Sequence, residues 1–173
     1  MLIHDFKLDS LDIKYSYKKC TNVNCKICKY STINYYIKAK GFILPLLNKS
    51  NCMSKGIVYI IKCKRCSVFY IGESKRKACV RINEHISNIS RFGKNLDLNI
   101  AKLEDISETA IHFNEQGHNM HEDFEFSIFK KDLEDSERWS NETDLINIFL
   151  RRNIPILNKK LNSIYSIRHL TFT

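Results

Sequence analysis

Two groups of cysteine and histidine residues carry the first chemical signal in this sequence. Cys63 and Cys66 are separated by two residues, and at a tight turn this spacing presents two thiolates to one tetrahedral ion. Zinc needs two further ligands, which His112 and His118 can supply, with His121 as a substitute for either. The alternative is a pair of half-buried thiols with unrelated surface histidines. The pattern favours a structural zinc site.

A second group of cysteines lies nearer the amino terminus. Cys20, Cys25 and Cys28 have the spacing of zinc ligands, and the fourth ligand would be Cys52 or His4. The alternative is free thiols on a flexible basic arm that contacts phosphates and bases. Because the chain has seven cysteines, an odd number, zinc thiolates in a reducing compartment explain them better than a disulfide framework. We expect a second zinc site here.

A third set of residues combines aromatic, basic, acidic and amide side chains. Arg81 and His85 are four residues apart, so they should share one face of a helix whose opposite face holds Ile82 and Ile89. Taken alone, an exposed pair of this kind is usually a solvated face, and Glu142 has other acidic residues around it. Their interest comes from the set to which they belong: Tyr59, Tyr70, Arg81, His85, Glu142 and Asn158.

The hydrophobic pattern indicates the elements that must position these residues. Residues 56–61 and 68–71 are β-branched and aromatic runs of strand length. Because only a short polar connection separates them, we expect an antiparallel hairpin with Cys63 and Cys66 at its turn. Residues 75–91 predict a helix, since apolar residues recur there at helical spacing: Cys79, Ile82, Ile86 and Ile89.

The second half of the chain continues with further elements. Residues 104–116 are a weaker helix candidate, and residues 124–128 alternate between apolar and polar as a third strand does. Residues 136–151 form a strong helical pattern, with Ser136 as the N-cap and Pro155 beyond the end. The resulting order of elements predicts a small mixed α/β (α+β) domain.

Composition and charge narrow the function classes. The chain has 173 residues, is 43% hydrophobic and contains only 5 Gly and 2 Pro, so it can bury a core and is not a disordered linker. Its net charge is +9, and residues 14–95 hold 18 basic residues but only two acidic ones. Such a field attracts polyanions, with nucleic acid as the first candidate, anionic membranes second and acidic proteins third.

The chain shows neither a membrane span nor a signal peptide. No apolar stretch approaches the roughly 18 residues that a membrane helix needs, and the amino terminus lacks a basic and then apolar layout. We therefore expect an intracellular protein with no membrane partner. Because the composition changes near residue 50, we divide the chain into a basic Cys-rich module at 1–52, a globular domain at 53–162 and a tail at 163–173.

Five short motifs cover about residues 53–160 and read Gly56-Ile57-Val58-Tyr59, Tyr70-Ile71-Gly72, Arg81-x3-His85, Glu142 and Pro155-Ile156-Leu157-Asn158. In order and spacing they resemble the motifs of the GIY-YIG nuclease superfamily. More narrowly, the Cys-x-x-Cys between the two tyrosine motifs, with His112 and His118 downstream, resembles the endonuclease domain of Penelope-like retroelements.

The resemblance implies a small three-stranded antiparallel sheet flanked by helices, with one nuclease site. The implied reaction is hydrolysis of a DNA phosphodiester that leaves a 3′-OH, which can prime reverse transcription. The implied cofactors are structural Zn2+ and catalytic Mg2+ or Mn2+. Besides DNA, the implied partners are the reverse transcriptase and the RNA of the same element, and the implied location is the nucleus.

The resemblance also implies a role for each residue of the site. Glu142 would bind the catalytic ion, and Arg81 would hold the scissile phosphate. Tyr59 would be the general base if Arg81 and the metal lower its pKa from the ordinary value near 10. The remaining residues would position water and phosphate or fix the geometry of the site: Tyr70, His85 and Asn158.

Two other functions stay open at this point. A zinc-stabilised module that binds nucleic acid without catalysis would need only the basic charge and the cysteine clusters. A stand-alone repair or homing nuclease would use the same catalytic residues without a retroelement. Cleavage of DNA separates the first alternative from a nuclease, and the encoding locus separates the second from a retroelement enzyme.

Overall fold

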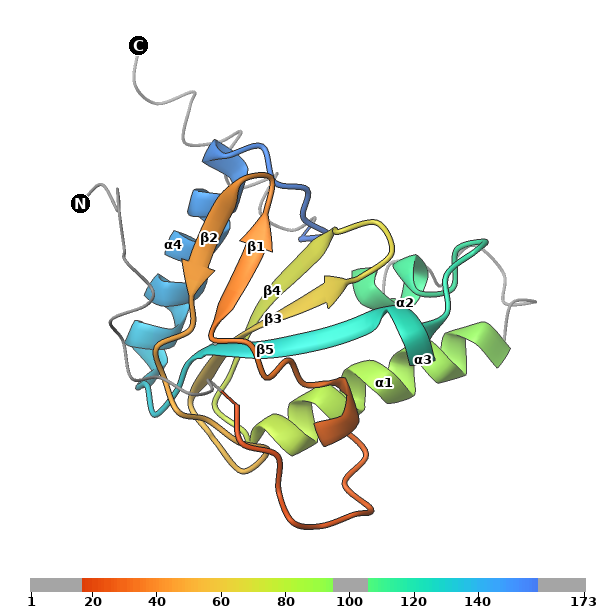
Figure 1. Cartoon of the computed structure of the whole chain (residues 1–173), viewed down its shortest axis with the longest axis horizontal. Helices are drawn as coiled ribbons and strands as arrows, with labels where there is room; N and C mark the ends of the chain where they lie inside the picture. The colour runs from red at the N-terminus through yellow and green to blue at the C-terminus, as the bar shows by residue number, and fades with distance from the viewer. Residues whose placement is uncertain (1–16, 95–105, 159–173) are drawn as a thin grey trace.

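The protein is built around a three-stranded antiparallel sheet (Figure 1). The computed structural model describes residues 17–94 and 106–158, so the candidate ligand His4 and the tail 163–173 lie outside the described residues. The strands follow the order β4-β3-β5, and both pairs are antiparallel: β3 (Ile57–Cys63), β4 (Phe69–Ser74) and β5 (Phe124–Lys130). This confirms the predicted mixed α/β fold and the hairpin with the Cys-x-x-Cys at its turn.

The central strand β3 is buried on both faces, and its sequence explains why. Ile57, Tyr59 and Ile61 belong to one hydrophobic cluster, while Val58 and Ile60 belong to the other. Side chains alternate across a strand, so the apolar and aromatic run at residues 57–61 needs cover on both sides.

Helices provide that cover on the two faces of the sheet (Figure 1). Core residues of α1 (Ala78–Lys94), α2 (Glu108–His112) and α3 (Met120–Asp123) pack in the cluster that contains Tyr59, and those of α4 (Asp135–Arg151) pack in the other. Among the described residues, no helix is long and apolar enough to cross a bilayer.

The ends of two helices differ from the prediction. Glu134 is the N-cap of α4 and forms a capping box with Glu137, so the expected N-cap Ser136 was wrong. Each glutamate accepts a hydrogen bond from the backbone of the other, which satisfies two donors of the first turn. The candidate helix at 104–116 is shorter than predicted: the Ser107 side chain caps its start by accepting from the Ala110 N–H, and α2 ends at His112 with Phe113 as the C-cap.

A second hairpin was missed by the sequence analysis. It pairs β1 (Tyr36–Ala39) with β2 (Phe42–Pro45) as a separate two-stranded sheet, and its buried residues pack with those of α4. Its turn residues Lys40 and Gly41 have φ angles of 43° and 76°, as two-residue type I′ turns require. The Lys-Gly pair between two apolar runs was the available signal.

Extended chain covers both edges of the main sheet. At β5, the Thr32 N–H donates to the Phe126 carbonyl at 3.0 Å. At β4, the Phe69 N–H donates to the Pro155 carbonyl at 3.0 Å, and the Phe69 carbonyl accepts from the Leu157 N–H at 2.7 Å. A segment from before the first tyrosine motif and the segment of the last motif, Pro155–Leu157, are therefore joined to the sheet by backbone pairing, which protects the edges from other chains.

Candidate active site and metal clusters

Three side chains meet at the hydroxyl of Tyr59. Arg81 Nε donates a hydrogen bond to Tyr59 Oη at 2.8 Å, and His85 Nε2 lies 2.8 Å from the same oxygen. Tyr59 lies on the central strand, while Arg81 and His85 come from consecutive turns of α1. The packing of α1 on the sheet thus brings together three of the residues that the sequence singled out.

His85 lies on the buried face of α1, where it is only 3% exposed and shares that face with Ile82 and Ile89. The expectation that Ile82 and Ile89 would occupy the opposite face was wrong, because positions separated by three and four residues recur on one side of a helix. Arg81 lies at the border of this face, with 28% of its side chain exposed.

The imidazole of His85 has a hydrogen-bond partner at each ring nitrogen. Nε2 faces the Tyr59 hydroxyl, and Nδ1 lies 3.0 Å from Thr109 Oγ1. Thr109, at the start of α2, is buried and lies 3.3 Å from Ser107 Oγ. One tautomer satisfies all these groups: the Tyr59 O–H donates to Nε2, and Nδ1–H donates to Thr109 Oγ1.

Burial controls the protonation of this group. The pKa of Tyr59 lies well above 10 because the side chain is fully buried, and the positive charge of Arg81 offsets this only in part. Arg81 by itself therefore does not give Tyr59 the lowered pKa that the sequence analysis required of a base. Burial, and next the charge of Arg81, lower the pKa of His85 to about 3. Both rings are uncharged at neutral pH.

Gly72 of the second tyrosine motif makes room for Tyr59. The two residues are partners across β3 and β4, and a Cβ on Gly72 would lie 2.5 Å from Tyr59 Oη. A larger residue would push the hydroxyl away from Arg81 and His85. The glycine is explained by this close approach.

On the open side of the site, Glu84 holds two arginines. Its carboxylate forms a bidentate pair with Arg76, with a contact to Nη1 and one of 2.7 Å to Nη2, and Arg81 Nη1 lies 3.3 Å away. The side chain of Arg76 is 48% exposed and that of Arg81 is 28% exposed. Two guanidinium groups that converge on one carboxylate are also arranged to bind a phosphate.

Glu142 approaches the site from α4 and is half-buried. Burial, and next the carboxylate of Glu73, raise the pKa of Glu142 to about 7, against a backbone hydrogen bond from Glu73 and the charge of Arg81. Arg138 holds Glu73 in place through Nε at 2.6 Å, with its own side chain only 5% exposed. A divalent cation that prefers oxygen ligands fits this pair, because its charge would offset both burial and carboxylate repulsion.

Tyr70 and Asn158 lie at the β4 side of the site. The ring of Tyr70 is half-buried, and its centroid lies 5.3 Å from that of His85. The amide of Asn158 accepts from the Ile71 N–H at 3.0 Å and donates to the Ile71 carbonyl at 2.6 Å. Since Ile71 lies between Tyr70 and Gly72, Asn158 fixes the backbone that carries the second tyrosine motif.

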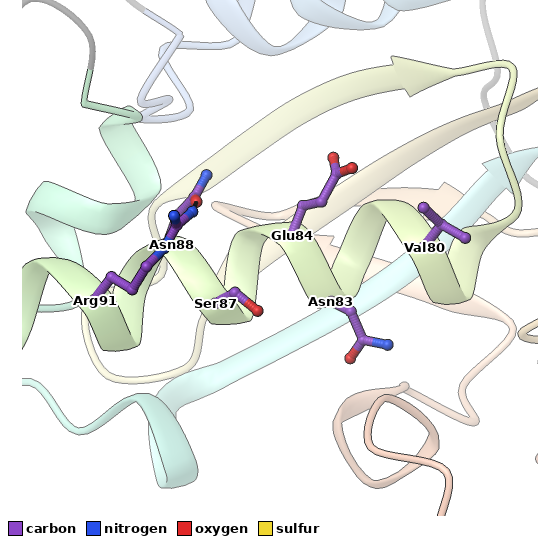
Figure 2. Close-up of a pocket in the computed structure, with 6 residues that line it drawn as sticks. All are labelled: Val80, Asn83, Glu84, Ser87, Asn88 and Arg91. Atoms are coloured by element: carbon purple, nitrogen blue, oxygen red, sulfur yellow. Dashed lines mark hydrogen bonds between the residues drawn. The ribbon is translucent and has the colours of Figure 1, made fainter.

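A hollow of about 510 Å3 lies along α1 next to the arginines. Figure 2 shows that all its lining residues belong to this helix: Val80, Asn83, Glu84, Ser87, Asn88 and Arg91. Amide, hydroxyl and arginine side chains are the groups that proteins use to contact the sugar-phosphate backbone of DNA. Because Glu84 belongs to both the hollow and the arginine pair, the two surfaces are continuous.

Cys63, Cys66, His112 and His118 form one cluster, and their ligand atoms all lie within 4.8 Å of one another. Cys66 Sγ and His112 Nε2 are 3.3 Å apart. The cluster joins the turn after β3 to the end of α2, so it connects the catalytic sheet with the helix that carries Thr109.

The surroundings of this cluster fit a zinc ion. Both ring nitrogens of His118 are buried and have no hydrogen-bond partner among the described residues, and buried polar atoms normally have one. The Glu115 carboxylate lies 3.4 Å from His112 Nδ1, where it would orient the ring for a metal at Nε2. The substitute ligand His121 is engaged elsewhere, because its Nδ1 lies 3.0 Å from the Tyr30 hydroxyl.

The four cysteines Cys20, Cys25, Cys28 and Cys52 form a second cluster of the same dimensions, with all sulfur atoms within 4.8 Å of one another. Of the two fourth ligands left open by the sequence, Cys52 is therefore placed with the other three, whereas His4 lies outside the described residues.

Sequence reasoning missed four residues that support the site: Glu73, Glu84, Thr109 and Arg138. A signal existed for the two glutamates, which are the only acidic residues in 14–95. An isolated acid in a basic segment is a candidate for pairing with a functional cation. Thr109 and Arg138 had no local signal, because their partners come from distant parts of the chain.

Comparison with known proteins gives one finding about the family. The family model described as GIY-YIG catalytic domain matches residues 55–153, which is more than half of the 173 residues. No curated protein and no solved structure gives a match.

Proposed function

Since the chain belongs to the GIY-YIG catalytic-domain family, we propose that it nicks DNA for a retroelement and leaves a 3′-OH that primes reverse transcription. The family itself gives the coarser function, a metal-dependent endonuclease with DNA as substrate. The observation that carries the finer proposal is the single cluster of Tyr59, Arg81 and His85, with Glu142 beside it. One set of catalytic groups acts on one strand at a time.

The retroelement role rests on the position of one metal cluster. Cys63 and Cys66 lie between the two tyrosine motifs, and His112 and His118 complete the cluster from α2. This is the arrangement in which the chain resembles the endonuclease of Penelope-like elements. We accordingly propose the reverse transcriptase and RNA of the same element as partners, and the nucleus as the place of action.

Two arginines bind the scissile phosphate in this proposal. Arg81 and Arg76 exchange the Glu84 carboxylate for phosphate oxygens, and their charge stabilises the negative charge that develops on phosphorus-bound oxygen. A Mg2+ or Mn2+ ion held by Glu142, with Glu73 beside it, would supply further charge there and activate the attacking water.

Tyr59 and His85 move the proton. Tyr59 Oη takes a proton from the attacking water while its own O–H proton passes to His85 Nε2. Burial and the charge of Arg81 hold the pKa of His85 at about 3 before substrate binds. When Arg81 turns toward the phosphate and water enters, both effects weaken, and His85 accepts the proton. As the water oxygen bonds to phosphorus, the bond to the 3′-oxygen breaks, and this oxygen takes a proton from solvent to become the 3′-OH. Tyr59 need not be ionised beforehand, so its raised pKa is compatible with the role. When Arg81 turns toward a phosphate, the hydroxyl that it covers becomes open to water.

The other predicted residues keep the geometry in this scheme. Tyr70, half-buried next to His85, positions the water and the phosphate, and Asn158 holds the β4 backbone beneath it. A structural zinc at the Cys63 cluster ties the β3–β4 turn to α2, which carries the Thr109 partner of His85.

A nicking assay tests the proposal. Supercoiled plasmid should become open circles in Mg2+ and remain supercoiled in EDTA, and a DNA polymerase should extend the nicks because they end in 3′-OH. Glu142→Ala should abolish nicking. The matched control is Asp144→Ala, which removes an exposed carboxylate from the same helix and should retain the wild-type rate.

Other outcomes identify the alternatives. Tight DNA binding without nicking in any divalent ion would contradict the proposal and favour a non-catalytic zinc module. Nicks that polymerase cannot extend would contradict the priming role while leaving the endonuclease activity intact.

A further inference from the structure

The four-cysteine cluster lies at the start of the catalytic helix. The backbone N–H of Cys79 donates to the Cys52 carbonyl at 2.9 Å, and the N–H of Ala78 donates to the Ser54 carbonyl at 2.8 Å. These are the first two residues of α1. The first N–H groups of a helix have no partner within the helix, so the loop that carries Cys52 caps α1 with its backbone.

The other three cysteines are anchored on a different part of the fold. Cys28 begins a short 3-10 turn, Cys28–Tyr30, and the chain directly after it pairs with the edge of β5 through Thr32. The ring of Tyr30 packs against Phe124 of β5, with centroids 5.5 Å apart. The cluster therefore connects the β5 edge with the first turn of α1.

The sulfur geometry suits a tetrahedral zinc. Cys28 Sγ lies 3.4 Å from Cys25 Sγ and 3.6 Å from Cys20 Sγ. A tetrahedron with zinc–sulfur bonds of about 2.3 Å has sulfur atoms about 3.8 Å apart, whereas a disulfide needs about 2.05 Å. The Tyr17 hydroxyl, in a residue only 2% exposed, lies 3.5 Å from Cys28 Sγ and can donate to a thiolate, as groups around metal ligands commonly do.

We propose that these four cysteines bind zinc and that this ion, through the Cys52 loop, positions the α1 turn that carries Arg81. Arg81 lies two residues after Cys79 and contacts the Tyr59 hydroxyl at 2.8 Å. A shift of the first turn would move its guanidinium relative to Tyr59 and the phosphate. The cysteines are thus positioning residues for the active site proposed above, on which the catalytic part of this inference rests.

The test compares three variants of the full chain. Cys20→Ser removes a ligand whose sulfur contacts Asn22 and Cys28, outside α1. Cys52→Ser removes the ligand on the capping loop. Cys79→Ser is the control because its thiol is outside both clusters. Zinc content should be two per chain for the wild type and Cys79→Ser, and one for the two ligand variants.

Amide hydrogen exchange measures directly how well the Cys52 loop caps the first turn of α1. In Cys20→Ser and Cys52→Ser, exchange at Ala78 and Cys79 should rise by about fivefold or more, as expected for a lost cap, while exchange at Ile60 in β3 stays unchanged. The single-turnover cleavage rate should fall by roughly 10- to 100-fold, with DNA affinity within about twofold of the wild type.

Several results would overturn the inference. One is a wild-type chain with one zinc and a disulfide among the four cysteines. Another is faster exchange in Cys52→Ser alone, because the loop would then hold the helix without the metal. An equal rise at Ile60 would mean that the ion stabilises the whole fold rather than the helix start. Zinc content and exchange do not depend on cleavage, so a failure of the proposed nuclease function would be seen separately.

Discussion

The two halves of the site differ in how completely their polar groups are paired. In the α1 half, formed by Tyr59, Arg81 and His85, each side chain has hydrogen-bond partners and Tyr59 is fully buried. In the α4 half, formed by Glu142 and Glu73, Glu73 is paired with Arg138, while burial and the charge of Glu73 raise the pKa of Glu142 to about 7.

This difference indicates that the two halves have different roles in the reaction. In the α1 half, Tyr59 and His85 are held in place before substrate arrives, and in our scheme only Arg81 turns to meet the developing charge on the phosphate. The α4 half is electrostatically incomplete, and a cation completes it. Changes in the α4 half should therefore affect metal-dependent steps, and changes in the α1 half should affect proton transfer and stability.

Glu142→Ala should have the largest effect. Loss of the carboxylate that would hold the catalytic ion should lower the single-turnover cleavage rate by about 1,000-fold or more, because metal charge is worth several kcal/mol in such reactions. DNA affinity without divalent ions should stay the same or improve, since a negative charge is removed. A variant that cleaves at the wild-type rate would show that the α4 half does not hold the ion.

Tyr59→Phe should have the next largest effect. It removes the hydroxyl that Arg81 and His85 share, and loss of proton transfer should slow cleavage by about 100-fold or more. Zinc content and metal affinity should not change. Tyr70→Phe is the comparison: because Tyr70 only positions water and phosphate in our scheme, its rate should fall less. A larger loss in Tyr70→Phe would transfer the proton-accepting role to the more exposed tyrosine.

The pH dependence of the free energy of unfolding tests the α1 half through its buried histidine, His85. His85 has a pKa of about 3 in the folded protein and about 6.5 when unfolded. Between these values the unfolded chain binds one more proton, so the free energy of unfolding rises with pH, by up to about 1.4 kcal/mol per unit, and levels off above about pH 7.

Urea unfolding of the wild type and His85→Gln from pH 5 to 8 measures this contribution. The stability difference between them should grow as the pH rises from 5 to about 6.5 and then remain constant. Using the difference removes the contributions of the other titratable groups, which both proteins share. A difference independent of pH would mean that His85 is not buried in its neutral form.

The sequence predicted which residues form the α1 half, but not their burial or their pKa shifts. The motif spacing placed Tyr59, Arg81 and His85 in one site, and regular apolar runs predicted the sheet and the main helices. The pattern did not show that His85 is buried, because a histidine among isoleucines can be read as either core or surface. Burial, which reverses the expected pKa shift of Tyr59, depends on how far α1 packs over the strand, and no local spacing encodes that.

The α4 half was predicted less completely. Glu142 was identified through the family resemblance, but Glu73 and its partner Arg138 were not, because they meet only when α4 packs on β4. The fourth ligand of the N-terminal cluster likewise depends on long-range packing. Cys52 and His4 were equivalent candidates in the sequence, and the loop that caps α1 places Cys52 with the other cysteines.

The smallest expected effect is at the far end of the α1 half, where Thr109 Oγ1 lies 3.0 Å from His85 Nδ1 and accepts its N–H proton in our scheme. Thr109→Val has nearly the same volume but leaves that buried N–H without an acceptor. A neutral hydrogen bond contributes about 1 kcal/mol, so cleavage should slow by roughly fivefold as His85 loses its orientation. Thr109→Ser keeps the hydroxyl and should restore most of the rate. If valine is tolerated and serine is not, the residue acts through packing alone, and the hydrogen-bonded part of the α1 half ends at His85.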